Sequence, residues 1–448
     1  MDGIFWERLI DNRVGHVVLL LSLFVCCFAA VPFWREKRPK KDPVHLKEKS
    51  QHILLSLLII SLLPHTKTKM KTLSGLNNGT LTNKENIKQI VEAFPNGIDF
   101  AFGYGSGVFV QEENKVNTNQ DAMVDLILSV SNVQAWHRDN LKKHYDHYAV
   151  LPRYFGPGFI SMLQNTGAGC YFNPMVEMKA NTMTCEKSRM VKYGVISHAK
   201  LIKDLTEWES MYVAGRMHKP ILPINNNVSI DNPATKLSDE IMDLQQNYNL
   251  KYAITSALLL LPLSNTFQKD NRQVPMRLLF ESIAGLSYIG DPRLAAGAED
   301  PQKIKKLVNS SGQLERFKSM YSEQISRLER LGVMSAGTNK KGECYLEMDL
   351  CDSSVGRNLL RDLPKNVHFH MQGQSSMLPK TSSGNTTIRT HQEIVSFAQN
   401  LSYVIQKIVG PPARIQSAKG LFTAGISKSL RYVQAKLAKG SLRNMPFK

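Results

Sequence analysis

The segment FAFGYGSGVF, residues 100–109, constrains the fold more than any other part of this chain. An apolar, strand-like run leads directly into three glycines, Gly103, Gly105 and Gly107, with Ser106 among them. Backbone amides at such a turn can converge on a phosphate group, and the missing side chains let its oxygens come close. A tight turn after a buried strand explains the same pattern, so the turn alone does not decide between the two interpretations.

A carboxylate in the next predicted strand favours the phosphate interpretation. Asp125 lies in MVDLIL, and a glycine–serine turn followed by a strand with an aspartate resembles the polymerase-β type of nucleotidyltransferase, whose strand carboxylates hold Mg²⁺. Two features depart from that pattern: the separation of Ser106 and Asp125 is longer than usual, and Ile127 occupies the place of a second acid. Three other aspartates could complete the metal site, and the sequence does not select among them: Asp121, Asp204 and Asp291.

The composition indicates a globular protein with an anionic partner. The 448 residues are 42% apolar, and 56 Lys and Arg against 38 Asp and Glu give a net charge of +18. Such a balance suits nucleic acid, an anionic membrane or a phosphorylated substrate, and it does not choose among them. The six cysteines form no CxxC pair and have no histidine at zinc-finger spacing, so we expect reduced thiols rather than disulfides or structural zinc.

The first 85 residues differ from the rest. Residues 17–34 are uncharged and just long enough to cross a bilayer, whereas the apolar run at residues 53–63 is too short. The extension is therefore a single anchor, a signal-like segment or a misassigned start upstream of Met70. Its acidic residues do not fit an ordinary mitochondrial transit peptide: Asp2, Glu7 and Asp11.

The remaining chain divides into four predicted parts. Residues 86–235 alternate helical and strand patterns and form an α/β domain, and residues 236–360 are mainly helical. Within the second part, ITSALLLLP reads as a buried core helix rather than a membrane span. Residues 361–412 are predicted to be a loop-rich connection, and residues 413–448 a basic amphipathic segment.

Several ordered blocks together resemble a known family. FGYGSGVF, AMVDLILSV, NTGAGCYFNP, VKYGVIS, YVAGRMHKP and SIAGLSYIGDPRL are similar, in that order, to the mitochondrial CDP-diacylglycerol synthases, also called translocator assembly and maintenance proteins. The resemblance is dense over residues 90–330 and thinner over the last 40. Apparent insertions near residues 178–189 and 264–276 lie outside it.

This resemblance implies a phosphatidate cytidylyltransferase. Such an enzyme transfers a cytidylyl group from CTP to phosphatidic acid with Mg²⁺, as a peripheral protein on the matrix side of the mitochondrial inner membrane, and feeds phosphatidylglycerol and cardiolipin synthesis. The family pairs a nucleotidyltransferase domain with a winged-helix-like domain and keeps a lone aspartate where Asp125 stands. The missing second acid is thus a family trait, and the oligomeric state stays open.

The same resemblance assigns the main site residues. Gly105, Ser106 and Gly107 are expected at the CTP phosphates, and Asp125 at Mg²⁺. Lys192 is expected to act in catalysis beside Asp125 and Ser106, since a flexible ammonium can follow phosphate charge; the alternative is a solvated surface charge.

Further residues have two interpretations each. Arg216 and Lys219 are phosphate ligands or solvated surface charges. Asp291 and Arg293 close over a phosphate, or belong to the turn at the end of a helix. His137 and His147 contact phosphate or ribose, or are packed, hydrogen-bonded histidines.

The C-terminal segment carries a membrane-binding pattern. Residues 413–448 contain no acid, and Ile426, Leu430, Val433 and Leu437 form one apolar helical stripe beside basic residues. The predicted membrane contacts are Lys428, Leu430, Arg431, Val433, Lys436 and Leu437, and the alternative is a disordered basic tail. Eight basic residues belong to the segment: Arg414, Lys419, Lys428, Arg431, Lys436, Lys439, Arg443 and Lys448.

Two other functions remain as alternatives. One is a nucleotidyltransferase that extends RNA, although few aromatic residues are interleaved with the basic ones for base stacking, so no nucleic-acid partner is expected. The other is a non-catalytic maintenance or scaffold protein of the import machinery, which the second family name suggests.

Overall fold

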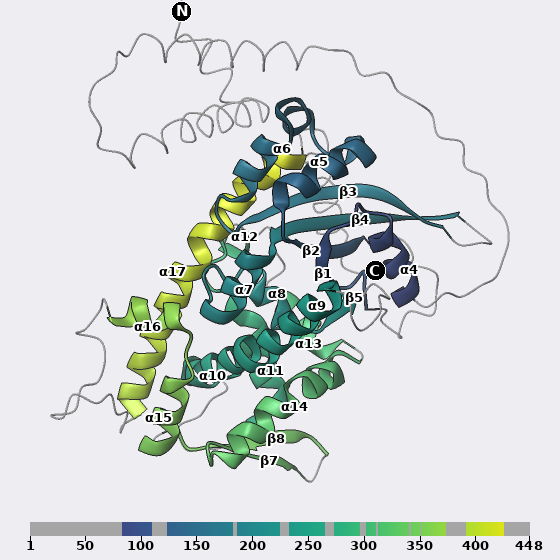
Figure 1. The fold of residues 1–448 in the computed structure, drawn as a ribbon. Coiled ribbons are helices and arrows are strands. Elements are labelled where there is room, and N and C mark those ends of the chain that lie inside the picture. The colour runs from purple at the N-terminus through teal and green to yellow at the C-terminus, as the bar shows by residue number, and fades with distance from the viewer. Residues whose placement is uncertain are drawn as a thin grey trace, which may run out of the picture. The chain divides into compact units, whose positions relative to one another are not determined.

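The computed structural model describes residues 83–109, 123–181, 186–224, 233–264, 273–295, 302–310, 312–339, 342–350, 352–372 and 391–424. The extension predicted over residues 1–85 lies outside them except for its last three residues, and so do all six predicted membrane contacts between Lys428 and Leu437. The described residues form a mixed α/β fold, as the sequence predicts, with helices on both faces of a five-stranded sheet (Figure 1).

The central sheet has the strand order β3-β4-β2-β1-β5. β2 pairs in parallel with β4 and antiparallel with β1, and its sequence VDLILSV is buried along nearly its whole length, as a central strand requires. The register sets Tyr104 opposite Asp125, and Asp125 opposite Lys192. The strands are β1 (Ile98–Tyr104), β2 (Val124–Val130), β3 (Cys170–Asn181), β4 (Glu186–Ser197) and β5 (Ile221–Ile224).

The apparent insertion near residues 178–189 lengthens one edge of this sheet. Met178 pairs with Arg189 and Asn181 with Glu186, so the insertion adds the outer part of the β3–β4 hairpin. The hairpin extends beyond the other strands in Figure 1.

One face of the sheet is covered by α4 (Asn83–Glu92) and α5 (Val133–Lys143). Ile87, Ile90 and Phe94 recur at helical spacing and are buried with Trp136 of α5 against the strands. A short 3₁₀ turn, η2 (Tyr145–His147), and α6 (Val150–Gln164) follow α5.

The other face of the sheet is covered by helices between residues 198 and 263. Phe102 and Ile127 of the sheet share one apolar cluster with Leu205, Leu258 and many helical residues further along the chain. These helices are α7 (His198–Glu207), α8 (Ala214–Met217), α9 (Pro233–Leu244), the π-helical turn η3 (Gln245–Leu250), α10 (Lys251–Leu260) and the 3₁₀ turn η4 (Leu261–Leu263). α10 is buried from Tyr252 to Leu260, which confirms the prediction of a core helix.

The mainly helical part also contains a small sheet. Three antiparallel strands lie in the order β6-β8-β7, namely β6 (Gln273–Pro275), β8 (Cys344–Glu347) and β7 (Ser335–Thr338). Phe280, Phe317 and Tyr321 stack in the interior beside them. The helices here are α11 (Met276–Gly285), the 3₁₀ turn η5 (Leu286–Tyr288), α12 (Pro292–Ala295), α13 (Lys303–Asn309) and α14 (Gln313–Arg330).

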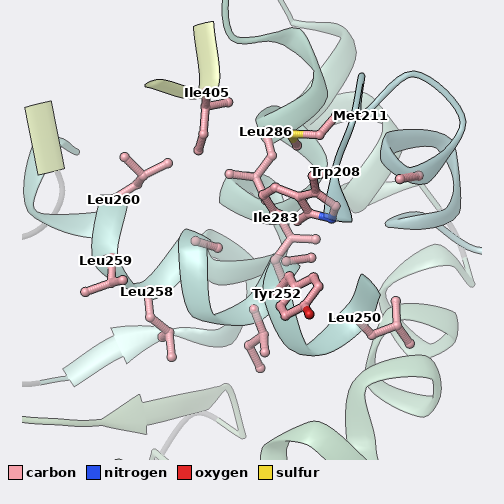
Figure 2. Packing of buried hydrophobic residues seen from close by; sticks show 14 of the residues in the cluster. Trp208, Met211, Leu250, Tyr252, Leu258, Leu259, Leu260, Ile283, Leu286 and Ile405 are labelled. Carbon is pink, nitrogen blue, oxygen red and sulfur yellow. The ribbon is translucent and has the colours of Figure 1, made fainter. Parts of the chain in front are cut away.

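The prediction of a loop-rich connection over residues 361–412 is wrong. Helices α15 (Ser353–Arg361), α16 (Lys365–Gln372) and α17 (His391–Ala424) occupy much of that region and continue past it. The prediction relied on the polar residues of this region and overlooked an apolar stripe at helical spacing, which is buried and stabilises α17: Ile394, Phe397, Leu401 and Ile405. α17 also continues through Pro411 and Pro412. In Figure 2, Ile405 of α17 lies in the same apolar interior as Leu260 of α10 and Ile283 of α11.

Lys419, one of the eight basic residues counted in the predicted basic segment 413–448, is buried in the fold. Its side chain is 1% exposed, and its Nζ donates to the carbonyl oxygens of Leu163 (3.1 Å), Gln164 (3.3 Å) and Thr166 (2.9 Å). These carbonyls end α6, where the helix dipole attracts a cation. Burial lowers the pKa of Lys419 to about 8. Within the described ranges, no helix combines the length and apolar character that a bilayer crossing needs.

Candidate active site

The glycine turn and Asp125 meet at the end of β1. Gly105 directly follows Tyr104, which pairs with Asp125, and a Cβ added to Gly105 would lie 3.7 Å from Oδ2 of that aspartate. Gly105 has a φ of +80°, a conformation that favours glycine, and its carbonyl accepts from the amides of Val108 (3.2 Å) and Phe109 (3.3 Å). The carboxylate therefore lies directly against the turn.

The three turn residues differ in exposure. Gly105 and Ser106 are exposed, whereas Gly107 is buried. A Cβ on Gly107 would come within 2.1 Å of the Met123 carbonyl oxygen, so the close approach to the chain before β2 requires a glycine there. This packing accounts for Gly107 without a ligand, while Gly105 and Ser106 are the residues open to one.

Lys192 extends the site across the sheet. It is the partner of Asp125 in the β2–β4 ladder, and its Nζ lies 3.4 Å from Asp125 Oδ1. The same ammonium lies 5.3 Å from the ring centroid of Phe172. Because the two charged side chains are only 24% and 25% exposed, their attraction is less screened than that of a surface pair.

Arg216 of α8 lies over aromatic rings beside this ladder. Its guanidinium carbon is 4.0 Å from the ring centroid of Tyr212, 5.5 Å from that of Tyr104 and 5.9 Å from that of Phe172, and it donates to the Tyr212 carbonyl. Burial opposes its charge, but Tyr212 and Tyr104 keep the pKa of Arg216 above the usual value. Tyr104 thus contacts this arginine through its ring and pairs with Asp125 through its backbone.

Lys219 is held in the protein among other cations. Its Nζ donates to the Gly215 carbonyl (2.6 Å) and to Ser287 Oγ (2.8 Å), which joins α8 to η5. Burial lowers the pKa of Lys219 well below its usual value, and the positive charges of Arg216, Lys303 and Arg293 lower it further. A partly buried lysine in a positive field is stabilised in its charged form by an anion.

Asp291 and Arg293 form an ion pair in the second half of the chain. Arg293 Nη2 lies 2.6 Å from Asp291 Oδ2, and its Nε lies 3.0 Å from Oδ1. Asp291 is 4% exposed; burial raises its pKa, but the hydrogen bonds from Arg293 outweigh it and leave the pKa lowered. Gly290, with a φ of +78°, precedes this pair as the turn interpretation requires. Arg216 lies within electrostatic range of both residues, and Arg293 within range of Lys219, so we call Arg216, Lys219, Arg293 and Lys303 the basic cluster.

His137 and His147 lie in a buried polar network, away from the surface. The ring nitrogens of His137 lie 2.7 Å from Tyr148 Oη and 2.8 Å from Gln164 Oε1, and burial lowers its pKa to about 4. The ring of His147 stacks on that of His144 at 4.5 Å between centroids, and its Nδ1 lies 3.0 Å from Tyr193 Oη. This arrangement favours the packed-histidine interpretation for both.

Two of the three aspartates that could complete the metal site have other partners, and Asp121 lies outside the described residues. Asp204 accepts from the amides of Ser210, Val213 and Ala214 and from Ser210 Oγ. Asp291 is committed to Arg293. Across the described parts of the chain, no three His, Cys, Asp or Glu side chains gather closely enough to hold a metal ion.

The site fits a metal ion that arrives with phosphate ligands. Mg²⁺ commonly takes one or two carboxylates, with substrate phosphates and water completing its coordination. Asp125 presents one partly exposed carboxylate next to the backbone of Gly105. This donor set suits a magnesium nucleotide and is too small for a cage made by protein alone.

The sequence did not indicate four residues that lie around Arg216 and Lys219: Tyr104, Phe172, Tyr212 and Lys303. Tyr104 lies inside the quoted turn motif, so an aromatic residue between Gly103 and Gly105 was the available signal. Tyr212 lies four residues before Arg216, whereas Phe172 and Lys303 reach this region from distant segments, which no local pattern reveals.

Comparison with known proteins identifies what the chain is similar to. Residues 87–439 match the family described as "Phosphatidate cytidylyltransferase, mitochondrial". A Rattus norvegicus protein of that name is 32% identical over 354 residues, covering 79% of this chain and 94% of the relative. Proteins with the same name from Schizosaccharomyces pombe (32% over 370 residues, 80% and 84%) and Drosophila melanogaster (33% over 369 residues, 79% and 97%) match similarly.

Proposed function

Because this chain belongs to the family of mitochondrial phosphatidate cytidylyltransferases, we propose that it transfers the cytidylyl group of CTP to phosphatidic acid. A phosphate oxygen of phosphatidic acid attacks the α-phosphorus of CTP, the bond to the β-phosphate breaks, and pyrophosphate leaves with the electron pair. The products are CDP-diacylglycerol and pyrophosphate. The observation that carries the assignment to a site is the contact of Asp125 with the Gly105 turn, with Lys192 alongside.

The turn and Asp125 bind the nucleotide in this proposal. Gly105 and Ser106 are exposed and offer backbone amides and a hydroxyl to the phosphate oxygens. Mg²⁺ held by Asp125 would neutralise charge on the triphosphate when bound. Lys192 is close enough to Asp125 to contact the same phosphates and to follow the charge that develops on the leaving group.

The basic cluster supports binding of two phosphorylated substrates. Arg216, Lys219 and Arg293 lie within electrostatic range of one another, and Lys303 lies within range of Lys219. Asp291 is the carboxylate paired inside the cluster, so the cluster keeps a positive excess. CTP, phosphatidic acid and pyrophosphate are all polyanions, and preorganised cations stabilise charge that moves between them.

The nucleophile needs no strong general base from the protein. A phosphate monoester has a second pKa of about 6 and is largely dianionic near neutral pH. A protein base is therefore not required, and the buried histidines His137 and His218 are not offered as one; burial lowers their pKa values to about 4 and about 3. Positioning and charge neutralisation are then the main contributions of the side chains.

The finer fold assignment is also a proposal. We assign residues 86–235 to a polymerase-β-like nucleotidyltransferase domain, supported by the mixed sheet, the glycine turn after β1 and the aspartate on β2. The helices α11 and α14 with the β7–β8 hairpin support a winged-helix-like second part.

We place the protein on the matrix side of the mitochondrial inner membrane as a peripheral enzyme. The relatives are named mitochondrial, and the sequence after residue 425 is basic and free of acids. An anionic bilayer attracts such a sequence.

Label transfer tests the proposed reaction. Purified protein is incubated with CTP labelled at the α-phosphate, Mg²⁺ and either phosphatidic acid or RNA. Label in a lipid-soluble product that depends on phosphatidic acid is the expected result. Label in RNA, or no transfer to lipid by folded protein, would overturn it.

A further inference from the structure

The helix α6 presents an exposed apolar surface that the proposed reaction does not use. Tyr154 is 81% exposed and Phe155 53% exposed. Their rings lie 5.2 Å apart, and Phe155 also lies 5.0 Å from Phe159 between ring centroids. We call Tyr154 and Phe155, with Tyr145 of the preceding turn η2, the α6 surface; Val150 and Met162 are further exposed apolar side chains of α6.

The backbone breaks in the middle of this surface. Gly156 has a φ of 77° and a ψ of −171° inside α6, and Pro157 follows it. A Cβ on Gly156 would meet nothing within 4 Å, so the glycine is there for its conformation and not for close packing. The two adjoining aromatic rings at positions 154 and 155 thus precede a sharp bend that opens to solvent.

Basic side chains border the α6 surface. The guanidinium of Arg153 lies 4.7 Å from the ring centroid of Tyr145, and the exposed Lys142 lies in the last turn of α5, just before it in the chain. Lys143 beside it donates to the Phe94 carbonyl instead. The neighbouring acid Asp139 is paired with Arg138, and Asp146 is the other acid of this stretch. Aromatic rings with lysines and arginines around them are typical of surfaces that enter the headgroup region of a bilayer.

The C-terminal basic sequence starts beside the same surface. Lys419 of α17 donates to three carbonyls at the end of α6, and a Cβ on Gly167 would lie 2.7 Å from the Ile415 side chain. α17 ends at Ala424, only a few residues beyond Lys419. Figure 1 shows this end of α17 next to α6. α17 therefore ends beside the C-terminal end of α6, and the acid-free sequence 425–448, with its six basic residues, follows it in the chain.

We propose that the α6 surface is a second membrane-docking element, which inserts Tyr154 and Phe155 into the headgroup region of an anionic bilayer. The proposal rests on the proposed function, because phosphatidic acid resides in a bilayer and its enzyme must reach it. A bilayer suits separate protruding rings bordered by cations better than a second copy of this chain, since two such basic borders would repel each other. The basic sequence supplies attraction over distance, and the rings supply hydrocarbon contact that salt does not screen.

Vesicle binding tests this surface independently of catalysis. The full chain and its Tyr154→Ser/Phe155→Ser variant are sedimented with vesicles of phosphatidylcholine and phosphatidylglycerol, at low and high salt and without CTP. Phe369→Ser is the matched control, because Phe369 is 70% exposed on α16 and Figure 1 shows α16 at the other end of α17. We expect the double variant to bind roughly tenfold more weakly, most clearly at high salt, and the control to bind as the parent does.

A second readout locates the ring itself. In vesicles of brominated lipid, Phe155→Trp is expected to show added fluorescence quenching relative to the parent, and Phe369→Trp none.

The double variant should lose activity on vesicle phosphatidic acid and keep it on short-chain phosphatidic acid dispersed in detergent. Unchanged vesicle binding, or a change of oligomeric state without a change in vesicle binding, overturns the docking proposal. Absence of product on both substrates together with normal vesicle behaviour would contradict the proposed reaction and not the docking surface.

Discussion

Tyr104 and Asp125 are direct partners in the ladder between β1 and β2, so the glycine turn that follows Tyr104 emerges beside the Asp125 carboxylate. The 3.7 Å separation between that carboxylate and the Cβ position of Gly105 turns a weak sequence motif into one site. The prediction that the turn and the aspartate can share one nucleotide is therefore compatible with the fold.

Asp125→Asn is expected to lower turnover by at least about a hundredfold, because it removes the charge that would hold a magnesium nucleotide while keeping the shape. Stability should change by less than about 1 kcal/mol, since the lost partner is the partly exposed Lys192. Label transfer from CTP and a thermal melt measure the two effects. Asp139→Asn, which breaks a similar ion pair with Arg138 on an exposed face of α5, should leave turnover unchanged. Full growth rescue by Asp125→Asn would favour the scaffold function over catalysis.

Gly107→Ala is expected to destabilise the fold by about 2 kcal/mol or more, because the new methyl group would overlap the Met123 carbonyl and force the backbone to move. The matched control is Gly420→Ala in α17, where a Cβ meets nothing within 4 Å and should stabilise the helix slightly. Urea unfolding measures both variants. Equal stability of the two would contradict the packing role given to Gly107.

The sequence predicted the parts of this site that depend on local patterns. IDFAFGY, the turn and MVDLILSV are contiguous signals, and the structure confirms both strands. The sequence could not predict that the Asp204 carboxylate accepts hydrogen bonds from backbone amides, because the chain after α7 must bend to bring Val213 and Ala214 to it. Nor could it predict that Lys419 caps α6, since the carbonyls involved lie more than 250 residues earlier. Charge patterns alone do not separate a buried lysine from a solvated one.

His137→Gln is expected to reduce the acid sensitivity of the fold. Burial lowers the pKa of His137 to about 4 from an ordinary value of 6.5, so the unfolded chain binds the proton first as pH falls. Stability from this neutral histidine is full above about pH 6.5 and declines toward pH 4, by up to about 3 kcal/mol. Urea unfolding at pH 7 and pH 5 should therefore show a smaller difference for the variant than for the parent. An identical difference would mean that His137 is not held neutral in the folded state.

Lys219 should take up a proton when CTP binds. Burial and the charges of Arg216, Lys303 and Arg293 lower its pKa well below that of a free lysine, whereas a bound triphosphate favours the charged form. Titration calorimetry in buffers of different ionisation enthalpy, between about pH 7 and 9, measures this uptake, which should increase with pH. Lys219→Met should remove about one proton of the uptake and weaken binding, while Lys318→Met, which alters an exposed pair with Glu315, should do neither. The neighbouring Lys303 is the other titratable cation near this site, so a parallel Lys303→Met variant assigns the proton. Binding of CTP without any proton uptake across this range would show that the phosphates do not reach Lys219, and would separate the basic cluster around it from the nucleotide site at Asp125.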